Sequence, residues 1–219
     1  MERFVDKNNE FNTYRNLLRW SYEILLYKEQ AECTEALNAI NIINHCKKNK
    51  VTVNCRSHAI VLTEALLSLN FKARTIGCLP IDILPVESHV MTSVYSNSLN
   101  KWIALDSARN CIYSCENDIL SISEIRNCLI NGKKINYVYQ NRFGKISQNY
   151  SNNIYNDEWF TDYLYKNMFR FVCNRINRVS DQSGRIAYHL APKGYLDYNI
   201  ERNIIYETEE ITIRYINNE

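Results

Sequence analysis

Apolar residues recur every three or four positions over the first fifty residues, which is the spacing of amphipathic helices. The first such stretch holds Tyr14, Leu17, Leu18, Tyr22, Leu25 and Leu26. The second holds Ala36, Leu37, Ala39, Ile40 and Ile43. Lysines 47, 48 and 50 follow it, where cations suit the negative end of a helix dipole. The pattern therefore predicts two N-terminal helices.

A third helix is predicted in the centre of the chain, over residues 57–69. Its apolar positions are Ile60, Val61, Leu62, Ala65, Leu66 and Leu69, which are typical of a mostly buried helix. Asn70 is the expected stop. Residues 73–79 then read as a strand, and Pro80 and Pro85 bracket a loop.

Two alternating segments, residues 89–96 and 101–106, are joined by Asn97-Ser98-Leu99-Asn100 and predict a β-hairpin. If Ser96 pairs with Lys101, one face carries Val90, Thr92, Val94, Ile103 and Leu105 and is apolar. The other face carries His89, Met91, Ser93, Tyr95, Trp102, Ala104 and Asp106. We therefore expect His89 and Asp106 on one face, as opposed or diagonal neighbours.

The second half of the chain has weaker patterns. Residues 123–130 predict a short helix, with Ser121 or Ser123 as its cap and Glu124 in its first turn. Residues 145–157 are polar and rich in Asn, which favours a surface loop. A buried helix is predicted from Trp159, Phe160, Tyr163, Leu164, Met168, Phe171 and Val172. Apolar and polar residues alternate over 204–216, which predicts one or two strands.

The chain length of 219 residues fits one domain over 1–219. Hydrophobic content of 46% and charged content of 23% exclude a disordered or fibrous protein. The net charge is only +2, and both signs are spread along the chain. The sequence therefore gives no case for a nucleic-acid or anionic-membrane partner.

Eight cysteines are scattered through the sequence. The charged start has no apolar core of a signal peptide, and no run reaches the ~18 apolar residues of a membrane span. We therefore expect a cytoplasmic protein with free thiols. The Cys111–Cys115 spacing is allowed for zinc, but no second ligand pair follows, so we expect no metal and no cofactor.

Cys55 stands at the start of the third predicted helix, where unpaired N–H groups favour a thiolate, and Arg56 adds positive charge. A thiolate attacks carbonyl carbon and needs a base to move the proton. His89 suits that task because imidazole titrates near neutral pH. Asp106 can hold the imidazole in one tautomer. The three residues predict a catalytic triad of Cys55, His89 and Asp106.

The stretches NCRSHAIVLTEALLSLNFKARTIGCLP and ESHVMTSVYSNSLNKWIALD resemble the core of the transglutaminase-like superfamily, within the papain-like fold. In that superfamily the nucleophilic Cys opens a helix, the His begins one strand and the Asp ends the next. The resemblance covers residues 50–110 and gives those roles to Cys55, His89 and Asp106. Trp102 matches a frequent aromatic ahead of the Asp. The resemblance to the superfamily implies that this chain is a small bacterial-type member with an α+β fold. In that fold, N-terminal helices are present and the nucleophile helix packs on an antiparallel sheet.

The sequence lacks features of two known groups that use the same kind of site. Arylamine N-acetyltransferases also use Cys, His and Asp, but the glycine-rich context around their Cys is missing here. Tissue transglutaminases bring acidic calcium loops, and this sequence has no comparable cluster, so calcium is not expected. A second donor for the oxyanion, beyond the Cys55 backbone N–H, is unassigned, and Trp20 and Asn49 are upstream candidates.

Several residues keep a plainer interpretation beside the functional one. Any single cysteine at a helix start is more often core filler, and a strand-end carboxylate such as Asp106 is often structural. His58 lies one turn from Cys55 and is more often packed or solvated than a base. The aromatic run 159–171 favours core, with an acyl-binding pocket as the alternative.

The expected activity is amide formation by acyl transfer through a thioacyl-enzyme. The acyl donor would be an amide or a thioester, small or bound to a carrier protein as in natural-product biosynthesis, and the acceptor an amine. A short chain with no secretion signal argues against a general protease, and an aromatic second half suits exclusion of water. The alternatives are a cysteine peptidase or amidohydrolase, and a non-catalytic binding protein on the same fold.

Overall fold

The predicted N-terminal helices and the central hairpin both form in the computed structural model. The structure describes residues 1–33, 37–82, 87–140, 157–174, 186–192, 195 and 210–216. Its helices are α1 (Glu10–Ile24), α2 (Ala39–Asn49), α3 (Cys55–Ser68), α4 (Ile122–Ile130) and α5 (Asp157–Asn167), with a short 3-10 turn at Glu2–Phe4. Two short strands, β1 (Leu26–Tyr27) and β2 (Thr52–Val53), pair in parallel beside these helices.

Nine strands form the main sheet, in the order β11-β10-β9-β3-β4-β5-β6-β7, with β8 also paired to β6. Their bounds are β3 (Ala73–Leu79), β4 (His89–Ser96), β5 (Lys101–Asp106), β6 (Cys111–Cys115), β7 (Asp118–Ile119), β8 (Asn136–Tyr139), β9 (Arg170–Asn174), β10 (Ile186–Pro192) and β11 (Glu210–Ile216). All pairs are antiparallel except β10 with β11. The chain is thus a mixed helix and mainly antiparallel sheet structure, which confirms the α+β class.

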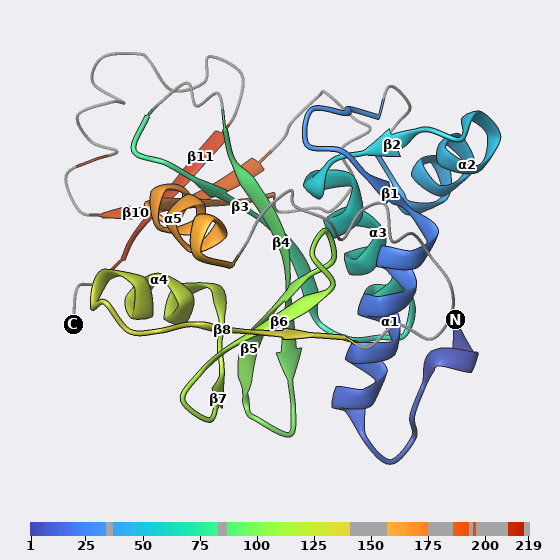
Figure 1. Ribbon diagram of the computed structural model, residues 1–219, viewed down its shortest axis with the longest axis horizontal. Helices are drawn as coiled ribbons and strands as arrows, with labels where there is room; N and C mark the ends of the chain where they lie inside the picture. The colour runs from blue at the N-terminus through green and yellow to red at the C-terminus, as the bar shows by residue number, and fades with distance from the viewer. Residues whose placement is uncertain are drawn as a thin grey trace.

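The hairpin register is the predicted one, because Ser96 pairs with Lys101 and Thr92 pairs with Leu105. The apolar face of the hairpin packs on α1 and α3, in a core that includes Leu17, Leu62, Val94, Ile103 and Leu105. Figure 1 shows α1, α2 and α3 gathered on one side of the β3–β5 strands and α4 and α5 on the other.

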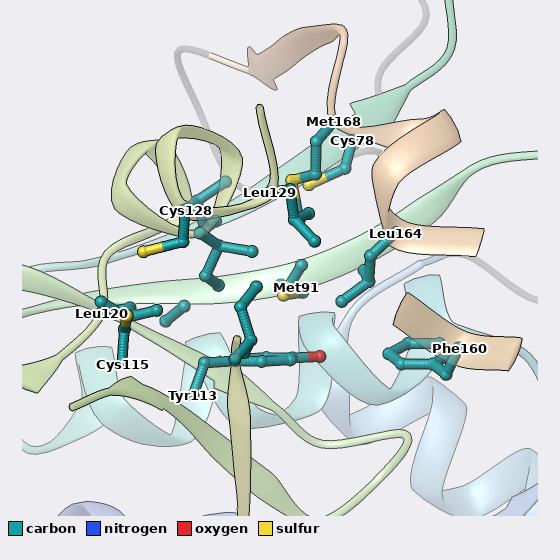
Figure 2. Packing of buried hydrophobic residues seen from close by; sticks show 14 of the residues in the cluster. Cys78, Met91, Tyr113, Cys115, Leu120, Cys128, Leu129, Phe160, Leu164 and Met168 are labelled. Atoms are coloured by element: carbon teal, nitrogen blue, oxygen red, sulfur yellow. The ribbon is translucent and has the colours of Figure 1, made fainter. Parts of the chain in front are cut away.

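The second face of the sheet is covered as well, by α4 and α5. Figure 2 shows this core, in which Met91 and Tyr113 from the sheet meet Leu129 of α4 and Phe160 and Leu164 of α5. The two cysteines considered as zinc ligands, Cys111 and Cys115, are free thiols within the same core, as is Cys128. His89 and Asp106 therefore lie on a buried face, between sheet and helix.

Local sequence explains most helix boundaries. The Asn9 side chain accepts from the N–H groups of Phe11 and Asn12 at the start of α1. Ser121 and Glu124 form a reciprocal capping box at the start of α4, which confirms the predicted helix and its cap. Asn70, the predicted stop after α3, has a φ of 63°.

Three expectations differ from the structure. The predicted helix over 159–172 ends at Asn167, and Phe171 and Val172 belong to β9, because that segment pairs with Gly77 and Cys78 of β3. Strands β6, β7 and β8 were not predicted. Ile40, assigned to the apolar face of α2, is 70% exposed.

Some expectations fall outside the described residues: Ala36, Pro85, and the loop over 145–157 except for Asp157. Of the predicted C-terminal strands, the segment 210–216 forms β11. Among the residues described, no helix combines the length and the apolar character needed to cross a membrane.

Candidate active site

Cys55 is the first residue of α3, as its sequence context predicts. Asn54 caps the helix, and its side-chain oxygen accepts from the Ser57 N–H at 3.3 Å. Cys55 is a free thiol, only partly buried, at the start of a helix whose residues 57–63, 65 and 66 are buried. The first turn of a helix presents N–H groups without partners in the helix, so the Cys55 sulfur lies at a locally positive end.

His89 begins β4 and Asp106 ends β5, and the hairpin register makes them diagonal neighbours on one face. His89 Nε2 lies 2.7 Å from Asp106 Oδ2, and both side chains are almost completely buried. The Cys55 side chain also acts on the same imidazole, since it is one of the groups that raise the pKa of His89. Because Nε2 faces Asp106, the second ring nitrogen is the one left for Cys55. The structure thus brings all three predicted residues together.

Charge fixes the protonation of the His89–Asp106 pair. Burial disfavours the imidazolium, but the charge of Asp106, the hydrogen bond that His89 donates to it and the influence of Cys55 outweigh burial and raise the pKa of His89 to about 10. Burial also opposes the carboxylate, yet His89 and the Tyr113 hydroxyl lower the pKa of Asp106. The pair is therefore ionised at neutral pH, so His89 carries a buried positive charge.

Three further groups hold Asp106 in place. The backbone N–H groups of Ala108 and Arg109 each donate to Oδ1 at 3.1 Å. The Tyr113 hydroxyl donates to Oδ2 at 2.6 Å. Figure 2 shows that hydroxyl pointing along the core toward Phe160. Sequence reasoning missed Tyr113 because it lies on β6, a strand that was not predicted.

Helix α5 forms an aromatic wall against the imidazole. Phe160 and Tyr163 meet His89 edge-on, with ring centroids 5.3 and 6.0 Å away, and Trp159 stacks on Tyr163 at 5.3 Å. These residues line a small cavity beside His89. Its full lining is Tyr27, Glu29, His89, Ala108, Arg109, Trp159, Phe160 and Tyr163. The aromatic run 159–171 thus supplies both core and cavity wall. Phe160 and Leu164 lie in the core, and Trp159, Phe160 and Tyr163 line the cavity.

Arg109 brings a positive charge to the same cavity. Its guanidinium lies over the Phe160 ring, 3.9 Å from the centroid, and pairs with Asp157 at 3.0 Å. It also donates to the Tyr139 hydroxyl at 2.6 Å. This side chain ties α5 to the sheet, since Asp157 begins α5 and Tyr139 ends β8.

Other sequence candidates lie elsewhere. Trp20 packs on Phe4 with ring centroids 5.6 Å apart, and the Asn49 side chain pairs with the His45 ring at 3.2 Å. Neither lines the cavity, so neither guess for the oxyanion donor is supported. His58 is fully buried, and burial lowers its pKa to about 4, which makes it a neutral packing residue that meets Tyr27 edge-on.

No protein-family model and no curated protein matches the sequence. Among solved structures, a candidate cysteine protease from Cytophaga hutchinsonii matches with a TM-score of 0.35 and 18% identity. The match covers 45% of this chain and 32% of that chain, so this chain spans about a third of its length. A likeness this partial carries no argument about activity, which must come from the site itself.

Proposed function

We propose that the protein is a cysteine-dependent enzyme that transfers acyl groups through a thioacyl-enzyme, with Cys55 as nucleophile, His89 as acid and base and Asp106 as the group that orients His89. The observation that carries the proposal is one buried imidazole that is hydrogen-bonded to Asp106 and has its pKa raised by both Asp106 and Cys55. Nucleophile, base and orienter in this relation are the general requirement for attack on carbonyl carbon. The arrangement on one helix start and two strands supports a transglutaminase-like site of the papain-like kind.

The proposed reaction has two halves. The Cys55 sulfur bonds to the carbonyl carbon of the donor, and the C=O π pair moves onto oxygen. As the C=O re-forms, the bond to the leaving thiol or amine breaks, and His89 supplies its proton. An amine then bonds to the thioester carbon and gives His89 its proton. The C–S bond breaks to release an amide and the thiolate.

The acceptor decides between amide formation and hydrolysis, and the aromatic wall supports the amine. His89 is 2% exposed and is covered by Phe160 and Tyr163, so bulk water has little access to the imidazole. Excluding water lets an amine compete for the thioacyl-enzyme. An amide or thioester donor, free or bound to a carrier protein, requires no cofactor for this chemistry.

Product analysis tests this assignment. The protein is incubated with an N-acetylcysteamine thioester of a simple acyl group and a primary amine, and amide and free acid are quantified beside a Cys55→Ala control. The proposal predicts amide in excess of acid, with neither product formed faster than background by the variant. Free acid alone would make the protein a hydrolase, and no turnover with any donor would favour a binding protein on this fold.

A further inference from the structure

We infer that Tyr27 is a catalytic residue whose hydroxyl donates a hydrogen bond to the oxyanion formed when Cys55 attacks the donor. This inference rests on the proposed function and goes beyond it by assigning the second oxyanion donor. The first donor in such a site is the backbone N–H of the nucleophile itself, at the start of its helix.

The backbone places Tyr27 beside the nucleophile. Strands β1 and β2 pair in parallel, with Tyr27 opposite Val53. The Lys28 N–H donates to the Val53 carbonyl at 3.0 Å and closes this pairing. Since Val53 stands two residues before Cys55, the pairing fixes Tyr27 against the segment that leads into α3. A residue 28 positions upstream is thereby brought to the site (55 minus 27).

Packing holds the Tyr27 ring toward the cavity. The ring meets His58, one turn along α3 from Cys55, with centroids 5.9 Å apart and an interplanar angle of 67°. Tyr27 and His89 line the same cavity. Within the described part of the chain, the Tyr27 hydroxyl has no hydrogen-bond partner. A half-buried donor left unused in a cavity beside a nucleophile is available for a ligand oxygen.

Electrostatics keep this hydroxyl protonated. Burial raises the pKa of Tyr27, and the nearby charge of Cys55 raises it further. Tyr27 therefore acts as a neutral donor over the working pH range, strengthening its hydrogen bond as negative charge develops on the carbonyl oxygen, without giving up its proton.

Most other donors that line the cavity are engaged, and the exception among the described residues is the Arg109 Nε, which is buried without a hydrogen-bond partner. The Tyr163 hydroxyl donates to the Ser88 carbonyl at 2.8 Å. The Arg109 guanidinium is paired with Asp157 and Tyr139. Glu29, when ionised, only accepts hydrogen bonds. Tyr27 thus combines an uncommitted hydroxyl donor with a place on the wall of the cavity that His89 also lines.

The test compares two reactions of Cys55 in wild type and Tyr27→Phe. Acylation by the N-acetylcysteamine thioester passes through an oxyanion, whereas alkylation by iodoacetamide does not. We expect the acylation rate to fall by about 10²-fold, the usual cost of one oxyanion donor, and the alkylation rate to stay within about twofold at each pH. Tyr95→Phe is the matched control, because it removes a hydroxyl bonded to Asn100 in the hairpin turn, and should change neither rate.

Three outcomes would contradict the inference. Equal acylation rates in wild type and Tyr27→Phe overturn it while leaving the proposed function intact. A parallel loss of acylation and alkylation would assign Tyr27 to the thiolate rather than to the oxyanion. A wild-type protein that accepts no acyl group would overturn the proposed function together with it. Thermal unfolding of Tyr27→Phe, expected within a few degrees of wild type, separates a catalytic loss from misfolding.

Discussion

The Tyr113 hydroxyl donates to Asp106 Oδ2, the same oxygen that accepts from His89 Nε2, at 2.6 and 2.7 Å. With Ala108 and Arg109 donating to Oδ1, the carboxylate accepts four hydrogen bonds in a buried position. A carboxylate satisfied in this way cannot rotate without losing several partners at once. Its direction, and hence the tilt of the imidazole, is set by the fold before any substrate arrives.

Removing that hydroxyl should cost stability more than activity. In Tyr113→Phe, the ring still fills its place in the core, but Asp106 loses one charged hydrogen bond. We expect the free energy of unfolding to fall by about 2 kcal/mol and kcat/KM to fall by less than about tenfold. Urea unfolding and acyl-transfer kinetics measure both. Tyr137→Phe, which frees only Thr161, is the control, and an equal loss there would refute the special role of Tyr113.

Exchanging the carboxylate for an amide should remove most activity. Asp106→Asn keeps the size of the side chain, but an amide N–H facing Nε2 forces the proton of a neutral imidazole onto the nitrogen that should accept from Cys55. We expect kcat to fall by on the order of 10⁴-fold. Circular dichroism should be unchanged. A loss of less than tenfold would show that Asp106 does not orient the base.

The ion pair should make stability depend on pH in a defined direction. The pKa of His89 is raised in the folded state, so its contribution is full below its unfolded value of 6.5 and declines as pH rises toward about 10. The free energy of unfolding lost in His89→Gln should therefore be larger at pH 5.5 than at pH 9.5. A pH-independent difference for His89→Gln would contradict the ion pair.

Glu10 joins α1 to the hairpin turn and should respond to acid. Its carboxylate accepts from the Ser98 N–H at 2.6 Å and from the Ser96 hydroxyl at 2.7 Å. Although burial raises the pKa of Glu10, bonds from Ser98, Ser96 and Asn97 lower it to about 2. Its contribution is thus present above pH 4.5 and lost as pH falls toward 2.

Glu10→Gln tests that connection. We expect it to reduce the free energy of unfolding by about 1 kcal/mol at pH 7, with the difference shrinking near pH 2. The exposed Glu2→Gln serves as control and should have no effect at either pH. Equal stability of Glu10→Gln and wild type at pH 7 would mean that the turn is held by its own backbone.

The elements with strong local signals were predictable. The hairpin register followed from alternation and a four-residue turn, and α3 followed from its apolar run, although the helix begins at Cys55 rather than at residue 57. Strands β6 and β8 could not be predicted, because apolar and polar residues alternate little along them and their pairing is long-range. Phe171 and Val172 extended a helical pattern by spacing alone, yet pairing with β3 places them in a strand.

The site divides in the same way. Cys55, His89 and Asp106 could be placed together because a helix start and a hairpin face are local features. Tyr27 and Tyr113 could not, since β1 pairs with β2 across 25 residues of sequence (52 minus 27) and Tyr113 lies on an unpredicted strand. That the whole chain is one domain stays a prediction.

The central claim is that Cys55 takes the acyl group, and intact mass tests it most directly. Wild type and Cys55→Ala are incubated with the N-acetylcysteamine thioester without amine and quenched in acid. Their intact masses are then measured by mass spectrometry. We predict one acyl adduct on wild type, mapped to the peptide that holds Cys55 and discharged on adding amine, and none on the variant. An adduct of equal yield on Cys55→Ala, or on the half-buried Cys33 instead, would contradict the account.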